Sequence, residues 1–334
     1  MDDTTNNGIT FRPRGLLANT HLQSILNSSA LRRRRLARQS ADYLLRSRRE
    51  VLSTPDDVHL LAWHAQPAAA NGALVVLLHG WEGSADSNYL LDTAMTLDRA
   101  GFETVRLNLR DHGDSHHLNE GLFHSCRLKE VIDAVAILSR RHGGGPVYLA
   151  GFSLGGNFAL RVARQASAHD FRLDMTVAVC PVIRPRHVLD ALATGFPLYH
   201  HYFVRKWRRS LQRKQRLYPE RYNLADWFRL TRLEDQTREL VIAHTEFPDL
   251  DSYLEGYSIA GDYLAGLEVP SLIIAAADDP IIPRRDIEAL PRTPALEIEI
   301  HPAGGHCGFL LDWRLNSWIG PRIEKALWKH LRSS

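Results

Sequence analysis

The most informative stretch of this chain is Gly151-Phe152-Ser153-Leu154-Gly155, which places a serine between two glycines. Residues 146–150 before it form an apolar run typical of a buried strand, and residues 154–166 after it are typical of a helix. A serine on a sharp strand-to-helix turn needs small neighbours, because the backbone there is crowded. The pattern is weak as a bare motif, but its context favours a catalytic nucleophile over a plain glycine-rich turn.

Apolar runs and amphipathic segments alternate on both sides of this turn. We expect strands at 73–78, 103–108, 146–150, 173–179, 271–275 and 296–300, and helices at 86–100, 125–141, 154–166, 284–290 and from about 313. Such alternation predicts a mainly parallel central sheet of about eight strands with helices on both faces. Two apolar runs within 48–64 flank a Pro-Asp-Asp turn and predict a hairpin that adds antiparallel edge strands.

The alternation fails in two segments. Residues 1–40 are polar and then basic, with arginine at every position from 32 to 35, and we expect an irregular arm with one short helix. Residues 184–262 are rich in Arg, Tyr and Trp without a clear buried strand, which predicts an inserted helical cap. The chain therefore divides into an arm (1–40), a core in two parts (41–183 and 263–334) and a cap (184–262).

The bulk composition excludes several classes of protein. A net charge of +3 is too mild to argue for nucleic acid. The wide spacing of Cys126, Cys180 and Cys307 fits neither a zinc site nor a disulfide framework, so we expect reduced thiols. The sequence shows neither a signal peptide nor an apolar run of roughly 18 residues that could span a membrane. We expect a cytoplasmic protein, and no protein partner is indicated.

Ser153 needs a base, because a serine hydroxyl is barely ionised at neutral pH. Among 17 histidines, His306 is the best placed, since two preceding glycines let its loop pass over the sheet after the last predicted strand. The acid that orients this imidazole should follow the preceding strand, where Asp278 and Asp279 both stand. We favour Asp279, which directly precedes a short apolar turn to proline, and keep Asp278 as its competitor.

The oxyanion that forms during acyl transfer needs two backbone N–H donors. We expect one from Leu154, the residue after the proposed nucleophile. The other should come from the loop after the strand 73–78, which reads His79-Gly80-Trp81-Glu82-Gly83. We assign that second donor to Trp81.

Several motifs together resemble the YheT-type branch of the α/β-hydrolases, a group with acylglycerol and phospholipid esterases and ester-forming acyltransferases. They are Phe11-Arg-Pro-Arg, Asn19-Thr-His21-Leu-Gln23, His79-Gly80-x-x-Gly83, Gly151-Phe-Ser-Leu-Gly-Gly-Asn157, Asp262-Tyr263, Asp278-Asp279-Pro280 and Gly304-Gly-His306-x-Gly308-Phe309. The resemblance implies the α/β-hydrolase fold and carboxylic-ester hydrolysis. It also implies the triad order Ser153, Asp279, His306, as in that fold.

One loop departs from this resemblance. Where many members have Arg-Gly, this chain has Arg110-Asp-His-Gly-Asp-Ser-His-His117. The side chains of this loop are of the types that bind metals, but their spacing is loose and ester hydrolysis by a serine needs no metal. We therefore expect a polar loop beside the active site, with no metal and no cofactor.

The predicted cap contains a basic amphipathic stretch, 203–217. Phe203, Val204, Trp207 and Leu211 fall on one helical face, with basic residues elsewhere. Such a helix can cover the active site with its apolar face, or it can lie weakly on an anionic membrane surface. We favour the lid and expect its aromatic residues to line an acyl pocket with the residue before the nucleophile: Phe152, Phe196, Tyr199, Tyr202, Phe203 and Trp207.

These patterns predict a serine carboxylesterase that cleaves small-molecule or lipid-like esters with an apolar acyl chain through an acyl-enzyme. One alternative is an acyltransferase that passes the acyl group to an alcohol. Another is a non-catalytic protein peripheral to a membrane, although such a protein has no need of a triad. The roles of the basic segments 32–49 and 205–216 stay open at this point.

Overall fold

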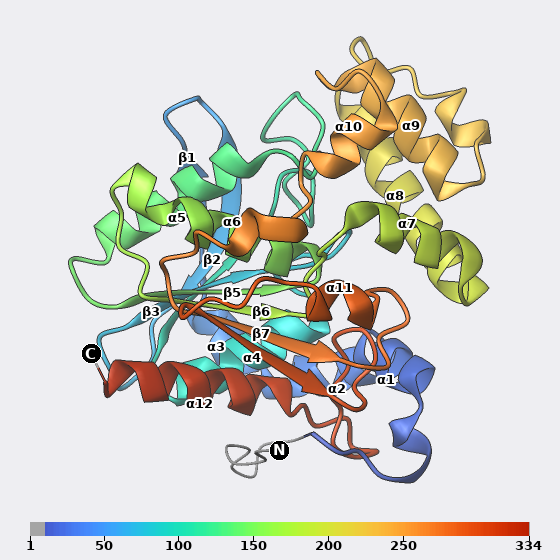
Figure 1. Cartoon of the computed structure of the whole chain (residues 1–334). Helices are drawn as coiled ribbons and strands as arrows, with labels where there is room; N and C mark the ends of the chain where they lie inside the picture. Colours follow the sequence, from blue (N-terminus) through green and yellow to red (C-terminus); the bar gives the residue numbers. More distant parts are fainter. Residues whose placement is uncertain (1–10, 334) are drawn as a thin grey trace.

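The computed structural model describes residues 11–333, which contain one eight-stranded sheet (Figure 1). The strands are β1 (Arg48–Ser53), β2 (His59–Ala65), β3 (Leu74–Leu78), β4 (Glu103–Leu107), β5 (Val147–Phe152), β6 (Met175–Val179), β7 (Ser271–Ala276) and β8 (Leu296–His301). Their order is β1-β2-β4-β3-β5-β6-β7-β8. Strand β2 is antiparallel to β1 and β4, and β3 to β8 run parallel. The predicted sheet and its edge hairpin are confirmed.

Helices cover both faces of this sheet, as the alternation predicted. They are α4 (Asn88–Arg99), α5 (Leu128–Arg141), α6 (Leu154–Gln165), α11 (Arg284–Glu288) and α12 (Ile319–Leu331). Successive side chains of a strand point to opposite faces, so Val76 of β3 packs in the cluster with α5 and α6, whereas Val75 packs in the cluster with α4 and α12. Figure 1 shows these two helical layers on either side of the sheet.

The prediction for the N-terminal arm was wrong. Residues 15–46 form a 3-10 turn and three helices, α1 (Thr20–Asn27), α2 (Ala30–Gln39) and α3 (Ala41–Arg46). Asn19 and Ser29 cap α1 and α2 with their side-chain oxygens. One residue of the arginine run in α2 points inward: Arg32 is buried and pairs with Asp92 of α4 at 2.6 Å. Residues 1–10 of the predicted arm lie outside the described residues.

The last helix begins later than expected, at Ile319 instead of near residue 313. Leu315 has a φ of 60°, which a helix does not tolerate, and Asn316 donates hydrogen bonds to Asp312 in a turn. From Ile319 onward, Ile323 and Leu327 form the predicted inward face. A non-helical turn at residues 312–316 therefore replaces the first turn of the predicted helix.

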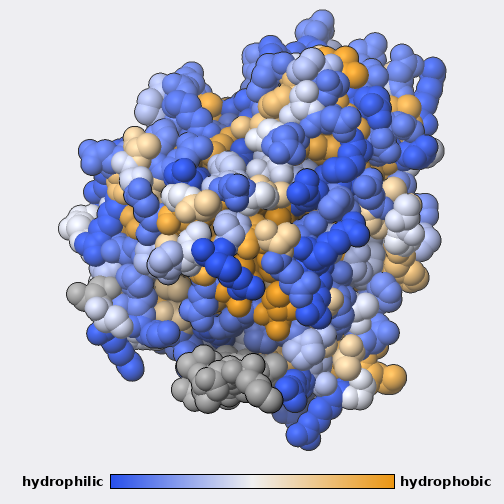
Figure 2. All heavy atoms as spheres, viewed as in Figure 1, coloured by the Kyte–Doolittle hydropathy of each residue, from blue (hydrophilic) through white to orange (hydrophobic). Residues whose placement is uncertain are grey.

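The segment expected to form the cap is helical. It contains α7 (Pro185–Thr194), α8 (Pro197–Leu217), a 3-10 turn (Trp227–Arg229), α9 (Leu233–His244) and α10 (Leu250–Glu255). Figure 1 shows α7 to α10 gathered beyond the end of the sheet toward which β7 and β8 point. In Figure 2 hydrophilic residues cover most of the outer side of these helices.

The topology of the sheet sets where a ligand can bind. Strand β3 lies between β4 and β5 in the sheet. The connection from β3 to β4 therefore runs toward one edge of the sheet, and the connection from β4 to β5 returns toward the other. In open α/β sheets such a reversal leaves a crevice at the carboxyl ends of the strands. Leu78 at the end of β3 pairs with Gly151 in β5, which brings the loop after residue 78 beside Ser153.

Candidate active site

Ser153 occupies a strained turn between β5 and α6, with φ of 54° and ψ of −117°. The two flanking glycines permit this turn. A Cβ on Gly151 would stand 2.1 Å from the carbonyl oxygen of Gly155, and one on Gly155 would stand 2.5 Å from the carbonyl oxygen of His79. Strain of this kind is stored at functional sites, where it holds a side chain in one orientation.

The structure brings Ser153, His306 and Asp279 together. Ser153 Oγ lies 2.9 Å from Nε2 of His306, and Nδ1 of that ring lies 2.9 Å from Oδ2 of Asp279. Oδ1 of Asp279 accepts hydrogen bonds from the backbone N–H groups of Ile281 and Ile282, at 2.8 and 3.0 Å. Burial has the largest single effect on His306 and lowers its pKa, but the charges of Asp279 and Cys307 and the hydrogen bond to Asp279 together outweigh it and raise the pKa to about 9.

Asp278 lies next to this arrangement and has a different partner. Its Oδ1 accepts a hydrogen bond from the backbone N–H of Gly305 at 2.9 Å. Burial raises the pKa of this carboxyl above its usual range, against the effect of that hydrogen bond. Asp278 therefore supports the backbone of the histidine loop, while Asp279 contacts the ring.

The candidate oxyanion donors lie beside the serine. A Cβ on Gly80 would stand 3.1 Å from Cβ of Ser153, so the 79–83 loop passes directly against it. Trp81 lines a pocket together with Ser153, Leu154 and His306. Leu154 is the first residue of α6, so its N–H has no acceptor within the helix.

Helix α1 of the N-terminal arm holds the histidine loop, a role that sequence reasoning missed. Ser24 Oγ accepts a hydrogen bond from the backbone N–H of His306 at 2.8 Å. Asn27 donates to the carbonyl of Cys307 at 2.5 Å, and Gln23 bonds both the N–H and the carbonyl of Leu310. The signal was present in the Asn19-Thr-His21-Leu-Gln23 motif, but the sequence does not show what that motif contacts.

An apolar pocket opens at Ser153 and is lined by residues of α7, α8 and α9. It encloses about 860 Å³, including the part open to solvent. Two of the predicted wall residues, Phe203 and Trp207 of α8, line it. Most of its other walls were not predicted, and they include Phe123, Val182, Val188, Leu189, Leu192, Leu240, Val241, Tyr253, Leu254, Tyr257 and Ile281. Val188, Leu189 and Leu192 share one face of α7, and this amphipathic spacing is a signal that could have found them.

The remaining predicted pocket residues lie elsewhere. Phe152 is fully buried in the core and packs on Tyr89. Phe196 is 46% exposed and contacts the ring of His21 in a tilted arrangement, and Nδ1 of His21 lies 3.0 Å from the hydroxyl of Tyr199. Both residues therefore connect the start of α8 to α1. Tyr202 lines a second, more polar pocket at Ser153.

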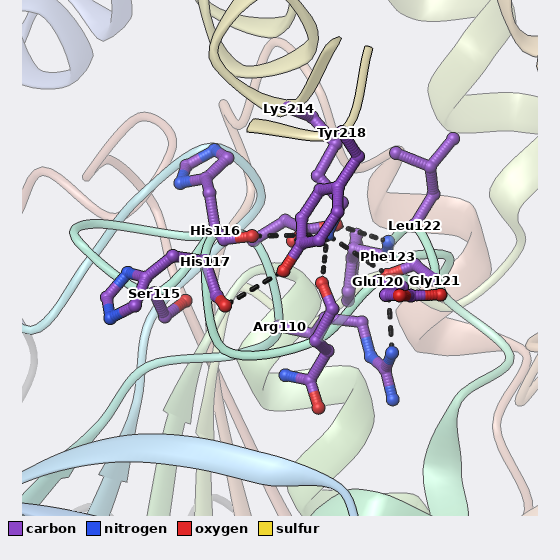
Figure 3. A network of polar contacts seen from close by, with 12 residues as sticks. Arg110, Ser115, His116, His117, Glu120, Gly121, Leu122, Phe123, Lys214 and Tyr218 are labelled. Atoms are coloured by element: carbon purple, nitrogen blue, oxygen red, sulfur yellow. Dashed lines mark hydrogen bonds and ion pairs between the residues drawn. The ribbon is translucent and has the colours of Figure 1, made fainter. Parts of the chain in front are cut away.

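The unusual loop 110–124 is a buried polar structure that holds α8 (Figure 3). Lys214 of α8 is fully buried, and its Nζ lies 2.7 Å from Oδ1 of Asp111. The same ammonium group donates to the carbonyl of Asn119 at 2.5 Å. Oδ2 of Asp111 accepts from the N–H of Phe123, a pocket residue, at 2.9 Å. Lys214 thus links the cap helix to the pocket wall through one carboxylate.

Two histidines of this loop, His112 and His116, have structural partners. Nε2 of His112 accepts a hydrogen bond from the N–H of Glu82 at 3.1 Å, and Nε2 of His116 lies 2.8 Å from Oγ of Ser210. Burial lowers the pKa of His112 to about 4 and those of His116 and His124 to about 3. These rings are therefore neutral at pH 7.

All three cysteines are free thiols. Within residues 11–333, one group of candidate metal ligands has its atoms within 4.8 Å of one another, and it comprises Cys180, His306 and Cys307. His306 already faces Ser153 and Asp279, and neither thiol is exposed. We treat this group as part of the packing under the histidine loop.

Comparison with known proteins agrees with this fold. A family model described as the alpha/beta hydrolase fold matches residues 73–312. The chain belongs to the α/β-hydrolase family. This hydrolase is YheT-like, being 28% identical to YheT of Escherichia coli (strain K12) over 97% of this chain and 94% of that protein. It is 24% identical to slr0264 of Synechocystis sp. over 79% of this chain and 77% of that protein, and both relatives carry the word esterase in their names.

Solved esterases share the fold of this hydrolase. The Pyrococcus furiosus esterase Pf2001 superposes with a TM-score of 0.58 at 14% identity, covering 85% of this chain and 91% of that one. Est1E from Butyrivibrio proteoclasticus superposes with a TM-score of 0.57 at 16% identity, covering 85% and 99%. In the described part of the hydrolase, no helix is long and apolar enough to cross a bilayer.

Proposed function

We propose that this α/β-hydrolase cleaves carboxylic esters with an apolar acyl chain through an acyl-enzyme on Ser153. The observation that carries the proposal is the hydrogen-bonded series Ser153–His306–Asp279 at the mouth of an apolar pocket. Family membership supports hydrolase chemistry of the esterase type. The pocket supports an apolar acyl group, because burial of each methylene contributes about 0.8 kcal/mol.

The proposed reaction uses this geometry. Ser153 Oγ attacks the ester carbonyl while Nε2 of His306 takes its proton, and Asp279 stabilises the resulting imidazolium. The backbone N–H groups of Leu154 and Trp81 donate to the oxyanion of the tetrahedral intermediate. The bond to the alcohol oxygen then breaks, and His306 gives the proton to that oxygen. Water then attacks the acyl-enzyme while His306 takes its proton. The bond to Ser153 Oγ breaks, His306 returns the proton to that oxygen, and the carboxylic acid is released.

The division of the chain into core and cap forms part of this proposal. Residues 184–262 would act as a cap, because α7, α8 and α9 supply pocket walls at the carboxyl ends of the strands. An acyltransferase would use the same acyl-enzyme but must exclude water. The second pocket at Ser153 has polar walls and a solvent-exposed residue, Arg33, which favours hydrolysis.

The test is the replacement of Ser153 by alanine. By analogy with known triads, this change should lower kcat for a p-nitrophenyl butyrate assay by roughly a million-fold and abolish labelling by a fluorophosphonate. Ser53→Ala, at an exposed position of β1, is the matched control and should keep full activity. Substantial turnover by a folded Ser153→Ala protein would refute the proposal.

A further inference from the structure

Ser153 lies between two pockets of different character. The apolar pocket described above extends under the cap helices. A second pocket shares Ser153, Trp81, Phe203 and His306 with it and extends toward the N-terminal arm. An ester has an acyl half and an alcohol half, so the two pockets suit the two halves of one substrate.

The second pocket is more polar than the first, and two cations from separate elements line it. Its walls include Ser87 and Asn88 at the start of α4, Arg33 of α2 and Lys206 of α8. Five of its residues, Arg33, Gly83, Ser87, Asn88 and Lys206, also line an adjoining hollow that includes Ala37 and Asp86. The pocket therefore leads from Ser153 outward between α2 and the 82–88 loop.

Neither cation is neutralised by an ion pair. Asp92 pairs with Arg32 and Asp86 with Arg106, and among residues 11–333 no carboxylate is within ion-pair distance of Arg33 or Lys206. Nζ of Lys206 instead donates to the backbone carbonyl of Glu82 at 2.7 Å. It also lies 5.0 Å from the ring centre of Tyr202.

Glu82, whose backbone carbonyl accepts from Lys206, carries little side-chain charge at neutral pH. Desolvation raises the pKa of Glu82 to about 8, although the charge of Lys206 opposes this shift. Glu82 is thus mostly protonated at pH 7. The cationic charge on this side of Ser153 consequently stays available to a ligand.

We infer that the polar pocket binds the alcohol half of the ester and that this alcohol carries an anionic phosphate group, held by Arg33 and Lys206. The inference rests on the proposed function, in which the alcohol leaves as His306 returns the proton to its oxygen. Guanidinium and ammonium groups are the usual partners of phosphate, and a hydrogen bond between ions is roughly twice as strong as a neutral one. The N-terminal arm and the cap would then each supply one substrate-binding cation.

The experiment compares two soluble esters with the same short acyl chain, 1-hexanoylglycerol 3-phosphate and 1-hexanoylglycerol. Both are used as monomers in solution, so that attraction to a lipid surface plays no part. The measured quantity is the ratio of kcat/KM for the phosphate ester to kcat/KM for the neutral ester. In the parent protein we expect a ratio of about ten or more, since two charge-assisted contacts are gained.

The decisive variant is Arg33→Gln/Lys206→Gln, which should lower that ratio about tenfold or more. Its matched control is Arg34→Gln/Arg205→Gln, which removes the same charge from exposed neighbours that do not line the pocket. The control should keep the parent's ratio. Equal losses in both double variants would mean that overall charge steers the substrate, and a parent ratio near one or below would also overturn the inference.

Binding to the Ser153→Ala protein separates this inference from the proposed function. If no variant hydrolyses either ester, the proposed function fails, yet calorimetry with the two esters still tests the pocket. We expect Kd for the phosphate ester to be about tenfold lower than Kd for the neutral ester. Equal Kd values would overturn the inference even if hydrolysis is observed.

Discussion

Replacing Lys214 with methionine should destabilise the protein and loosen the cap. The ammonium group of Lys214 is fully buried against Asp111, whose side chain is 6% exposed. Methionine fills most of the same volume but leaves the carboxylate with the N–H of Phe123 as its remaining donor. Removing one partner of a buried ion pair costs about 3–5 kcal/mol, because the other charge stays uncompensated.

The expected loss can be stated as a melting temperature. With an unfolding entropy of about 2.1 cal/mol/K per residue, a loss of about 3–5 kcal/mol lowers Tm by about 4–7 °C for 334 residues. Burial already raises the pKa of Asp111 to about 6 with Lys214 present, and removal of the cation should raise it further. Protonation of Asp111 then relieves the uncompensated charge at low pH, so the destabilisation should be smaller at pH 5 than at pH 8.

Calorimetric melting of the parent and variant at pH 5 and pH 8 measures both effects. Lys129→Met is the matched control, since Lys129 is 59% exposed and its pairs with Asp56 and Asp133 lie at the surface. Its Tm should change by less than about 1.5 °C, because exposed pairs contribute about 0–1 kcal/mol. A fall in Tm of about 1.5 °C or less for Lys214→Met, or an equal fall at the two pH values, would refute the reasoning.

Three further predictions concern the proposed triad and the acyl pocket. Asp279→Asn should lower kcat about 10⁴-fold, by analogy with serine proteases, because the wrong imidazole tautomer then faces Ser153; Asp278→Asn should cost far less, and equal losses would reverse the assignment. With a pKa near 9, His306 is mostly protonated at pH 7, so kcat/KM should rise with pH toward an apparent pKa of about 9, and a plateau already at pH 7 would contradict this. The same raised pKa favours the folded state below about pH 6.5, an advantage lost as pH rises through about 9. Trp207→Glu should raise KM for longer acyl chains most strongly, as measured with p-nitrophenyl esters of graded length, and an unchanged chain-length profile would remove α8 from the acyl pocket.

The choice between Asp278 and Asp279 as the residue that contacts His306 could not be decided from the sequence. Asp278 and Asp279 are adjacent and follow the same strand, so spacing places both near His306. The turn Asp279-Pro-Ile-Ile favoured Asp279, but only the folded loop shows one carboxylate on the ring and the other on the backbone N–H of Gly305. A shift of one residue along this irregular loop would exchange the positions of the two carboxylates, and no local sequence pattern specifies that shift.

The sequence by itself determined the sheet, its helices and the region of the candidate site, because these depend on local signals. Hydrophobic periodicity marks each strand and helix, and parallel strands place their carboxyl-terminal loops at one edge. Only the tertiary structure decided the rest. It showed that α1 supports the histidine loop, that Lys214 is buried, and that many of the pocket walls come from α7, α9 and the segment after α9. Those contacts join residues far apart in the chain, and their partners are set by how the cap and the arm pack on the sheet rather than by any nearby residue.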